Sequence, residues 1–170
     1  MDSLKYINHY PEATKKQVLE LIKHEKLGQH LKKKYANPHT IKTDKALFAY
    51  VNELKNANIK NAPTLSKVLY DAKINVIHNA LGTHHFVSRV QGAKLKSKNE
   101  IRISSIFKSV PLEFLEMIVV HELAHFKAKE HNRAFYSLCE YMQPSYHQVE
   151  FDVRLYLTQM ELFGKVEEWN

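Results

Sequence analysis

The clearest chemistry in this sequence is the pentapeptide HELAH at residues 121–125. Apolar residues recur at helical spacing on both sides of it, so the pattern predicts one helix that runs through the motif. Histidines four positions apart project from the same face of a helix, about 6 Å apart along its axis. His121 and His125 can therefore bind one metal ion together, and imidazole nitrogens are ordinary ligands of Zn²⁺.

The glutamate between these histidines has a different predicted role. Glu122 follows His121 directly and so points about 100° away around the helix. From there its carboxylate cannot easily join the same set of ligands, but it can reach a water molecule in the open position of the metal. Zinc lowers the pKa of such a water toward about 7, and a neighbouring carboxylate can accept its proton. Glu122 is therefore the predicted general base.

A catalytic zinc site needs a third protein ligand, and three residues compete for this position. His131 comes six residues after His125, so it reaches the metal only if the chain turns between them. Asn132 is a good N-cap for a helix that begins after such a turn. His131 is the principal prediction, and Glu150 and His147, on a later predicted helix, are the alternatives.

Several other polar residues are secondary candidates. Asp152 is placed to accept a hydrogen bond from a ligand imidazole, and Tyr136 or Tyr146 is placed to stabilise an oxyanion. His84 and His85 are adjacent, but no cysteine, histidine or carboxylate follows at close ligand spacing. We therefore expect no second metal there.

The stretch from Ile101 to the aromatic pair Phe135-Tyr136 resembles the YgjP-like zinc metallopeptidases. In that family a proline-initiated helix carries HELxH and is followed by a histidine and an aromatic pair. The resemblance covers about residues 64–160. It implies that His121, His125 and His131 are metal ligands and that Glu122 is the catalyst, the same roles that the residue spacing predicts.

The elements that must position this site form an α+β pattern. Residues 1–60 read as an N-terminal helical region, and residues 64–165 as the metallopeptidase domain, with the two expected to form one compact unit. Alternation of apolar residues predicts strands at about 66–76, 84–91 and 100–104. The predicted fold is zincin-like: a small antiparallel sheet beside the motif helix, followed by C-terminal helices.

Composition places the chain among ordinary globular proteins. It has 170 residues, of which 44% are hydrophobic and 25% charged. Its one cysteine, Cys139, excludes a disulfide within the chain. No run of apolar residues is close to the length of about 18 that a membrane-spanning helix requires, and the first residues do not form a signal peptide. These features predict a cytoplasmic protein.

Charge is distributed unevenly along the sequence. Lys and Arg outnumber Asp and Glu by 12 to 6 in residues 1–60 and by 8 to 2 in residues 61–110, whereas residues 111–170 have 5 against 10. The basic surplus over residues 1–110, which includes Lys32, Lys33 and Lys34, suggests a weak association with nucleic acid. A solvated basic surface without a partner is the alternative.

The principal functional prediction is a zinc metallopeptidase that acts on a peptide or protein substrate, as the resemblance implies. HExxH determines how water is activated but not which bond is attacked. A hydrolase of a phosphoester or nucleotide substrate is therefore the first alternative. The second is a DNA-associated protease or adaptor that uses the basic N-terminal region, similar to the SprT-type proteases.

Overall fold

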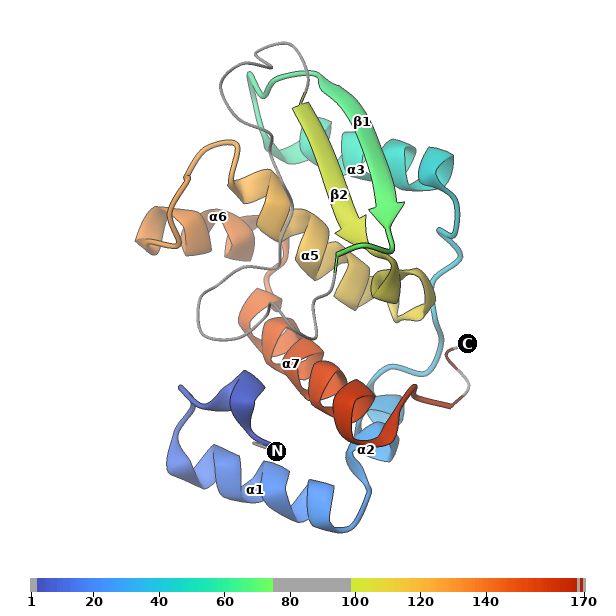
Figure 1. Cartoon of the computed structure of the whole chain (residues 1–170). Coiled ribbons are helices and arrows are strands. Elements are labelled where there is room, and N and C mark those ends of the chain that lie inside the picture. The colour runs from blue at the N-terminus through green and yellow to red at the C-terminus, as the bar shows by residue number, and fades with distance from the viewer. Residues whose placement is uncertain (1–2, 75–98, 168, 170) are drawn as a thin grey trace.

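The helix that carries the HELAH motif, α5 (Leu112–Ala124), runs through the middle of the fold (Figure 1). Ten of its 13 residues are buried, because apolar side chains are spread around the whole helix. It contacts α6 (Arg133–Met142), α7 (Tyr146–Phe163), the strand β2 (Asn99–Ser104) and the 3-10 helix η2 (Ser105–Ser109). The motif is therefore held on a helix whose side chains are mostly buried.

The computed structural model describes residues 3–74, 99–167 and 169, and within these ranges the fold is mostly helical. The helical N-terminal part that the sequence predicts is present. Its elements, with the strand that follows them, are η1 (Lys5–Ile7), α1 (Glu12–Lys23), α2 (Leu27–Lys34), α3 (Asp44–Asn58) and β1 (Leu65–Asp71). No helix in the described ranges is both long and apolar enough to cross a membrane.

The sheet corrects the predicted topology. β1 and β2 pair in parallel, with Val68 opposite Ile101 and Tyr70 opposite Ile103, so the predicted antiparallel sheet is wrong. The prediction assumed that successive strands turn back directly on one another. The connection between β1 and β2 instead spans residues 72–98, which is long enough to return the chain to the same end of the sheet. The strand predicted at 84–91 lies outside the described residues.

β1 ends at Asp71, five residues before the predicted end of the strand. The Asp71 carboxylate accepts a hydrogen bond from the backbone N–H of Lys73 at 2.8 Å, which is the local bond of a turn. It also pairs with Arg102 of β2 at 2.9 Å. Asp71 therefore ends the strand and ties it to its neighbour. The helix α3 packs against β1.

The long helix α7 connects the N-terminal elements to the site. It contacts both α2 and η1. Asp152 of α7 is fully buried and accepts hydrogen bonds from Lys34 Nζ at 3.0 Å and from the Tyr35 hydroxyl at 2.7 Å. Asp152 therefore joins α7 to the end of α2, and these contacts replace the predicted hydrogen bond to a ligand imidazole. Lys34, one of the lysines of the predicted basic surface, has a structural role in this contact. The division of the chain near residue 60 stays a prediction.

Candidate metal centre

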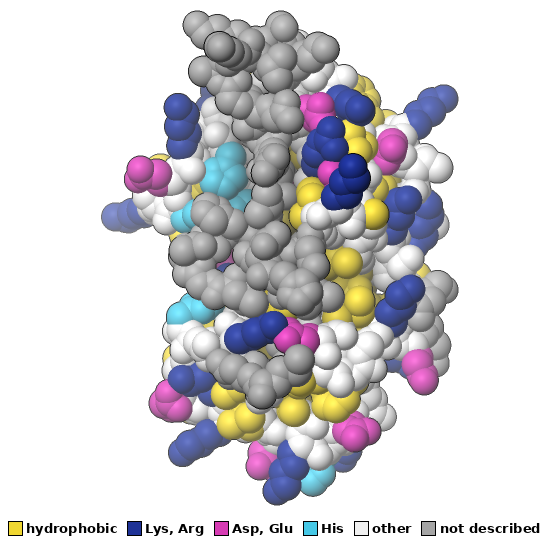
Figure 2. Space-filling view, viewed as in Figure 1, with side chains coloured by type: hydrophobic (Ala, Val, Ile, Leu, Met, Phe, Trp, Pro, Cys, Tyr) yellow, Lys and Arg dark blue, Asp and Glu magenta, His cyan; other side chains and the backbone are white. Residues whose placement is uncertain are grey.

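Three histidine side chains meet at the C-terminal end of α5. His121 Nε2 lies 3.3 Å from His125 Nε2 and 3.2 Å from His131 Nε2. One ligand atom from each of the three residues lies within 4.8 Å of the others. His121 is buried, whereas His125 and His131 are half-buried, so part of the cluster is accessible to solvent. Histidine side chains reach the surface in the region of α6 and the loop before it (Figure 2).

The chain turns sharply between the second and third histidines. The helical hydrogen bonds of α5 end at Ala124, whose carbonyl accepts from the N–H groups of both Lys127 and Ala128. A new helix begins after Asn132, whose side chain accepts from the backbone N–H of Phe135 at 3.0 Å. The predicted cap at Asn132 is thus confirmed. This turn brings His131 to the cluster although it follows His125 by six positions.

Phe135 packs beneath all three rings. Its ring centroid lies 4.9 Å from that of His121, 4.7 Å from that of His125 and 4.7 Å from that of His131. The side chain is fully buried on the first turn of α6. Packing on one aromatic ring limits the rotation of each imidazole and separates the cluster from the core.

The geometry fits a tetrahedral cation. Nitrogens about 2.05 Å from a tetrahedral zinc ion lie about 3.3 Å apart, which is the spacing found between the Nε2 atoms here. His125 Nδ1 lies 3.1 Å from the Ala128 carbonyl, which can only accept, so Nδ1 carries the hydrogen and Nε2 is the nitrogen that faces the cluster with its lone pair. The three histidines therefore form a possible metal site. Imidazole ligands suit several transition metals.

The two alternative ligands lie outside the cluster. Glu150 is buried on α7, where Arg154 Nη2 donates to it at 3.0 Å. His147 is exposed and lies 3.2 Å from the Glu140 carboxylate. Neither belongs to a metal-binding group of three among the described residues. Glu122 lies one residue after His121 on α5, and only 4% of it is exposed.

The two candidate oxyanion residues occupy different places. The Tyr146 hydroxyl lies 2.9 Å from His121 Nδ1, so it contacts the outer side of the cluster. The Tyr136 ring is half-buried, 6.5 Å from that of His131, and burial raises the pKa of its phenol. The contact between Tyr146 and His121 joins residues 25 positions apart, and the sequence carries no signal for it.

The loop between α5 and α6, together with Arg133 at the start of α6, is basic. Lys127, Lys129 and Arg133 are all exposed, and none of them forms an ion pair within the described part of the chain. Glu130 is the one acidic residue between them. The rim beside the histidines is therefore positive, although residues 111–170 as a whole carry 10 acidic against 5 basic side chains.

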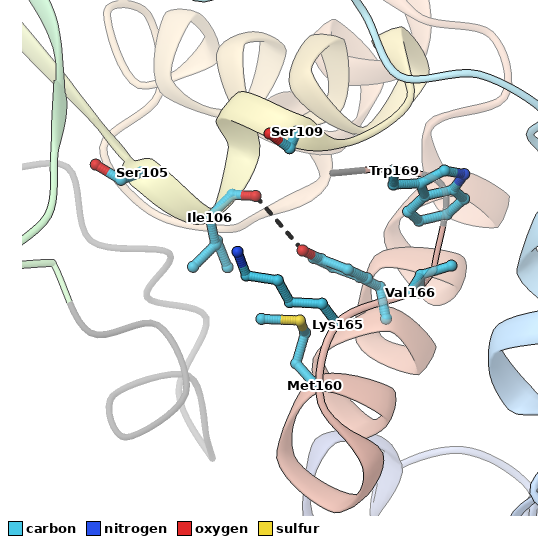
Figure 3. A pocket seen from close by; sticks show the side chains of 8 residues that line it. Ser105, Ile106, Ser109, Met160, Lys165, Val166 and Trp169 are labelled. Carbon is cyan, nitrogen blue, oxygen red and sulfur yellow. Dashed lines mark hydrogen bonds between the residues drawn. The ribbon is translucent and has the colours of Figure 1, made fainter.

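A separate hollow of about 230 Å³ lies between η2 and the C-terminal segment (Figure 3). Ile106, Tyr156, Lys165 and Trp169 contribute to its walls, and the Tyr156 hydroxyl lies 3.5 Å from the Ile106 carbonyl. None of its lining residues is a histidine or a carboxylate. This hollow is therefore distinct from the candidate metal centre. His84 and His85 lie outside the described residues.

Comparison with known proteins gives two findings. The family model of the YgjP-like metallopeptidase domain matches residues 16–153. A UTP pyrophosphatase of Escherichia coli (strain K12) is 56% identical over 162 residues, which are 95% of this chain and 97% of that protein. No solved structure matches this chain.

The second finding overturns the predicted substrate. A relative that is 56% identical along almost the whole chain is named for a nucleotide substrate, so the prediction of a peptidase acting on a peptide or protein is wrong. The error has a physical origin, because an HExxH helix supplies metal ligands and a base without selecting the electrophile. The nucleotide alternative is the better supported of the sequence-based hypotheses.

Proposed function

This chain belongs to the YgjP-like family, and we propose that it is a UTP pyrophosphatase that uses the histidine cluster of α5 as its metal centre. It is an enzyme of the metal-dependent hydrolase class. The 56% identity to a protein of that name, extending over 95% of this chain, carries the proposal. In the proposed reaction one water molecule is added to UTP, the bond between the α- and β-phosphates breaks, and UMP and pyrophosphate are released.

In this proposal His121, His125 and His131 hold the cation, which we infer to be zinc. The cation would supply Lewis acidity toward a phosphate oxygen and toward water. Glu122 accepts the proton of the attacking water, which is the role that its position one residue after His121 suggests. Phe135 keeps the three imidazoles in place from below.

The basic loop supports a polyphosphate substrate. UTP carries several negative charges, and Lys127, Lys129 and Arg133 offer three positive charges with no partner among the described residues. Charges of one sign around a site raise the local concentration of an oppositely charged substrate. This rim is local, because the C-terminal third of the chain is otherwise acidic.

The reaction is tested by identifying its products. Zinc-loaded protein incubated with UTP is expected to form UMP and pyrophosphate in equal amounts, as measured by ³¹P NMR and by nucleotide chromatography. Protein stripped with a chelator is expected to lose this activity and to regain it when zinc is returned, because the proposed centre acts through its cation. Formation of UDP and phosphate, or no turnover by the zinc-loaded protein, would contradict the proposed reaction.

The basic loop is tested by neutralising two of its charges. The double variant Lys127→Ala, Lys129→Ala is expected to raise the KM for UTP by about fivefold or more with little change in kcat, because each exposed charge contributes about 0.5–1 kcal/mol to substrate binding. The effect should shrink at high salt. Steady-state kinetics at two salt concentrations measure both quantities.

The matched control is Lys16→Ala, Lys23→Ala on α1. Both lysines are exposed and unpaired within the described residues, and α1 lies away from the loop before α6 (Figure 1). This variant removes the same net charge and is expected to leave the KM unchanged. Equal KM values for the two double variants would show that the loop has no special part in binding UTP.

A further inference from the structure

We propose that Tyr146 is a positioning residue that holds the His121 imidazole in the orientation and tautomer needed to bind the cation. The inference rests on the proposed metal centre. The Tyr146 hydroxyl lies 2.9 Å from His121 Nδ1, on the side of the ring opposite the nitrogen that joins the cluster. Tyr146 is fully buried and His121 is 4% exposed, so water does not readily replace this contact.

The tautomer of His121 follows from what a cation requires. Nε2 must present its lone pair to the metal, so Nδ1 must carry the hydrogen and donate it to the Tyr146 oxygen. A phenol oxygen can accept this hydrogen and still donate its own. The opposite tautomer would point an N–H at the cation.

The position of Tyr146 is fixed by the helix that it begins. Tyr146 is the first residue of α7, and its backbone N–H donates to the Gln143 carbonyl at 2.8 Å. Further along α7 the buried pair Glu150–Arg154 joins the helix to the Tyr6 carbonyl, which accepts from Arg154 at 3.0 Å. α7 also packs directly on α5. The hydroxyl therefore approaches His121 from a rigid element, as the outer partner of a metal ligand must.

A purely structural role for Tyr146 makes different predictions, and Tyr156 supplies the matched control. Tyr156 is also buried on α7, at 5% exposure, and its hydroxyl lies 3.5 Å from the Ile106 carbonyl, far along the helix from the histidines. Tyr146→Phe and Tyr156→Phe each remove one hydroxyl group and keep the ring. A structural role would lower the stability of the metal-free protein, whereas a positioning role would weaken metal binding.

The test measures zinc affinity by competition with a chelator and thermal unfolding of the metal-free proteins. Tyr146→Phe is expected to weaken zinc binding about 10- to 100-fold, the usual effect of losing an outer partner of a histidine ligand. Its metal-free unfolding midpoint is expected to change no more than that of Tyr156→Phe, and Tyr156→Phe should bind zinc as the wild type does. The proposal would be overturned if Tyr146→Phe bound zinc within twofold of the wild-type affinity. It would also be overturned if Tyr146→Phe and Tyr156→Phe lost the same amount of zinc affinity.

A second measurement uses the wild-type protein and so does not depend on how the variants fold. In ¹⁵N NMR spectra of the zinc-loaded protein, His121 is expected to show a protonated Nδ1 that exchanges slowly with solvent. A protonated Nε2 at His121 would contradict the proposal. Neither measurement involves UTP. Failure of the wild type to hydrolyse UTP would therefore refute the proposed function, whereas the zinc affinities and the NMR result would still test the role of Tyr146.

Discussion

Replacing Glu122 by glutamine is expected to reduce UTP hydrolysis by about 100- to 10,000-fold, the usual contribution of a general base, while the protein keeps its metal. Glutamine has nearly the same shape as glutamate but cannot accept the proton of the attacking water. The three histidines that form the cluster are unaffected by the change. Initial rates of pyrophosphate release and metal content by elemental analysis measure the two outcomes on the same samples.

Glu113→Gln is the control for this substitution. Glu113 lies on the first turn of the same helix, is exposed and stands two turns or more from the histidines. The same change of charge there is expected to leave hydrolysis at the wild-type rate. Loss of metal from Glu122→Gln would make Glu122 a ligand instead of a base, and full activity in that variant would remove it from the mechanism.

The sequence predicts those parts of the site that depend on local spacing. A helix through the HELAH motif follows from the helical periodicity of the apolar residues. His121 and His125 are four positions apart, which places both on one face of that helix. Asn132 predicts the start of α6, and the spacing of His131 requires a turn, which the sequence places after about residue 129, whereas α5 ends at Ala124. These local rules were sufficient to bring His131 to the cluster, where the structure has it.

The sequence does not predict what depends on distant parts of the chain. β2 pairs with β1 in parallel across a long separation in the sequence, and alternation of apolar residues within each strand is the same in either direction. Asp152 binds Lys34 and Tyr35, more than 100 positions away, so no local pattern excluded it from the site. The substrate is similarly unconstrained by the HELAH motif, because activation of water is common to peptide and phosphoanhydride hydrolysis.

Replacing His131 by alanine is expected to weaken zinc binding more than about 100-fold, which exceeds the usual effect of removing an outer partner of a ligand. The change leaves two imidazoles, His121 and His125, where a catalytic zinc site needs three protein ligands. UTP hydrolysis is expected to fall in parallel with metal occupancy. Elemental analysis of protein purified without added zinc, together with chelator competition, measures the loss.

His147→Ala is the matched control, because His147 is the exposed histidine nearest in sequence and it lies beside Glu140 instead of in the cluster. This variant is expected to keep both zinc and hydrolysis. Zinc retained at wild-type affinity by His131→Ala would mean that a group outside the cluster completes the ligand set. Glu150 would then be the leading candidate, and it would have to leave Arg154, with which it now forms a buried ion pair at 3.0 Å. Breaking that pair would take the carboxylate away from a buried guanidinium, so the three-histidine site is the less costly arrangement.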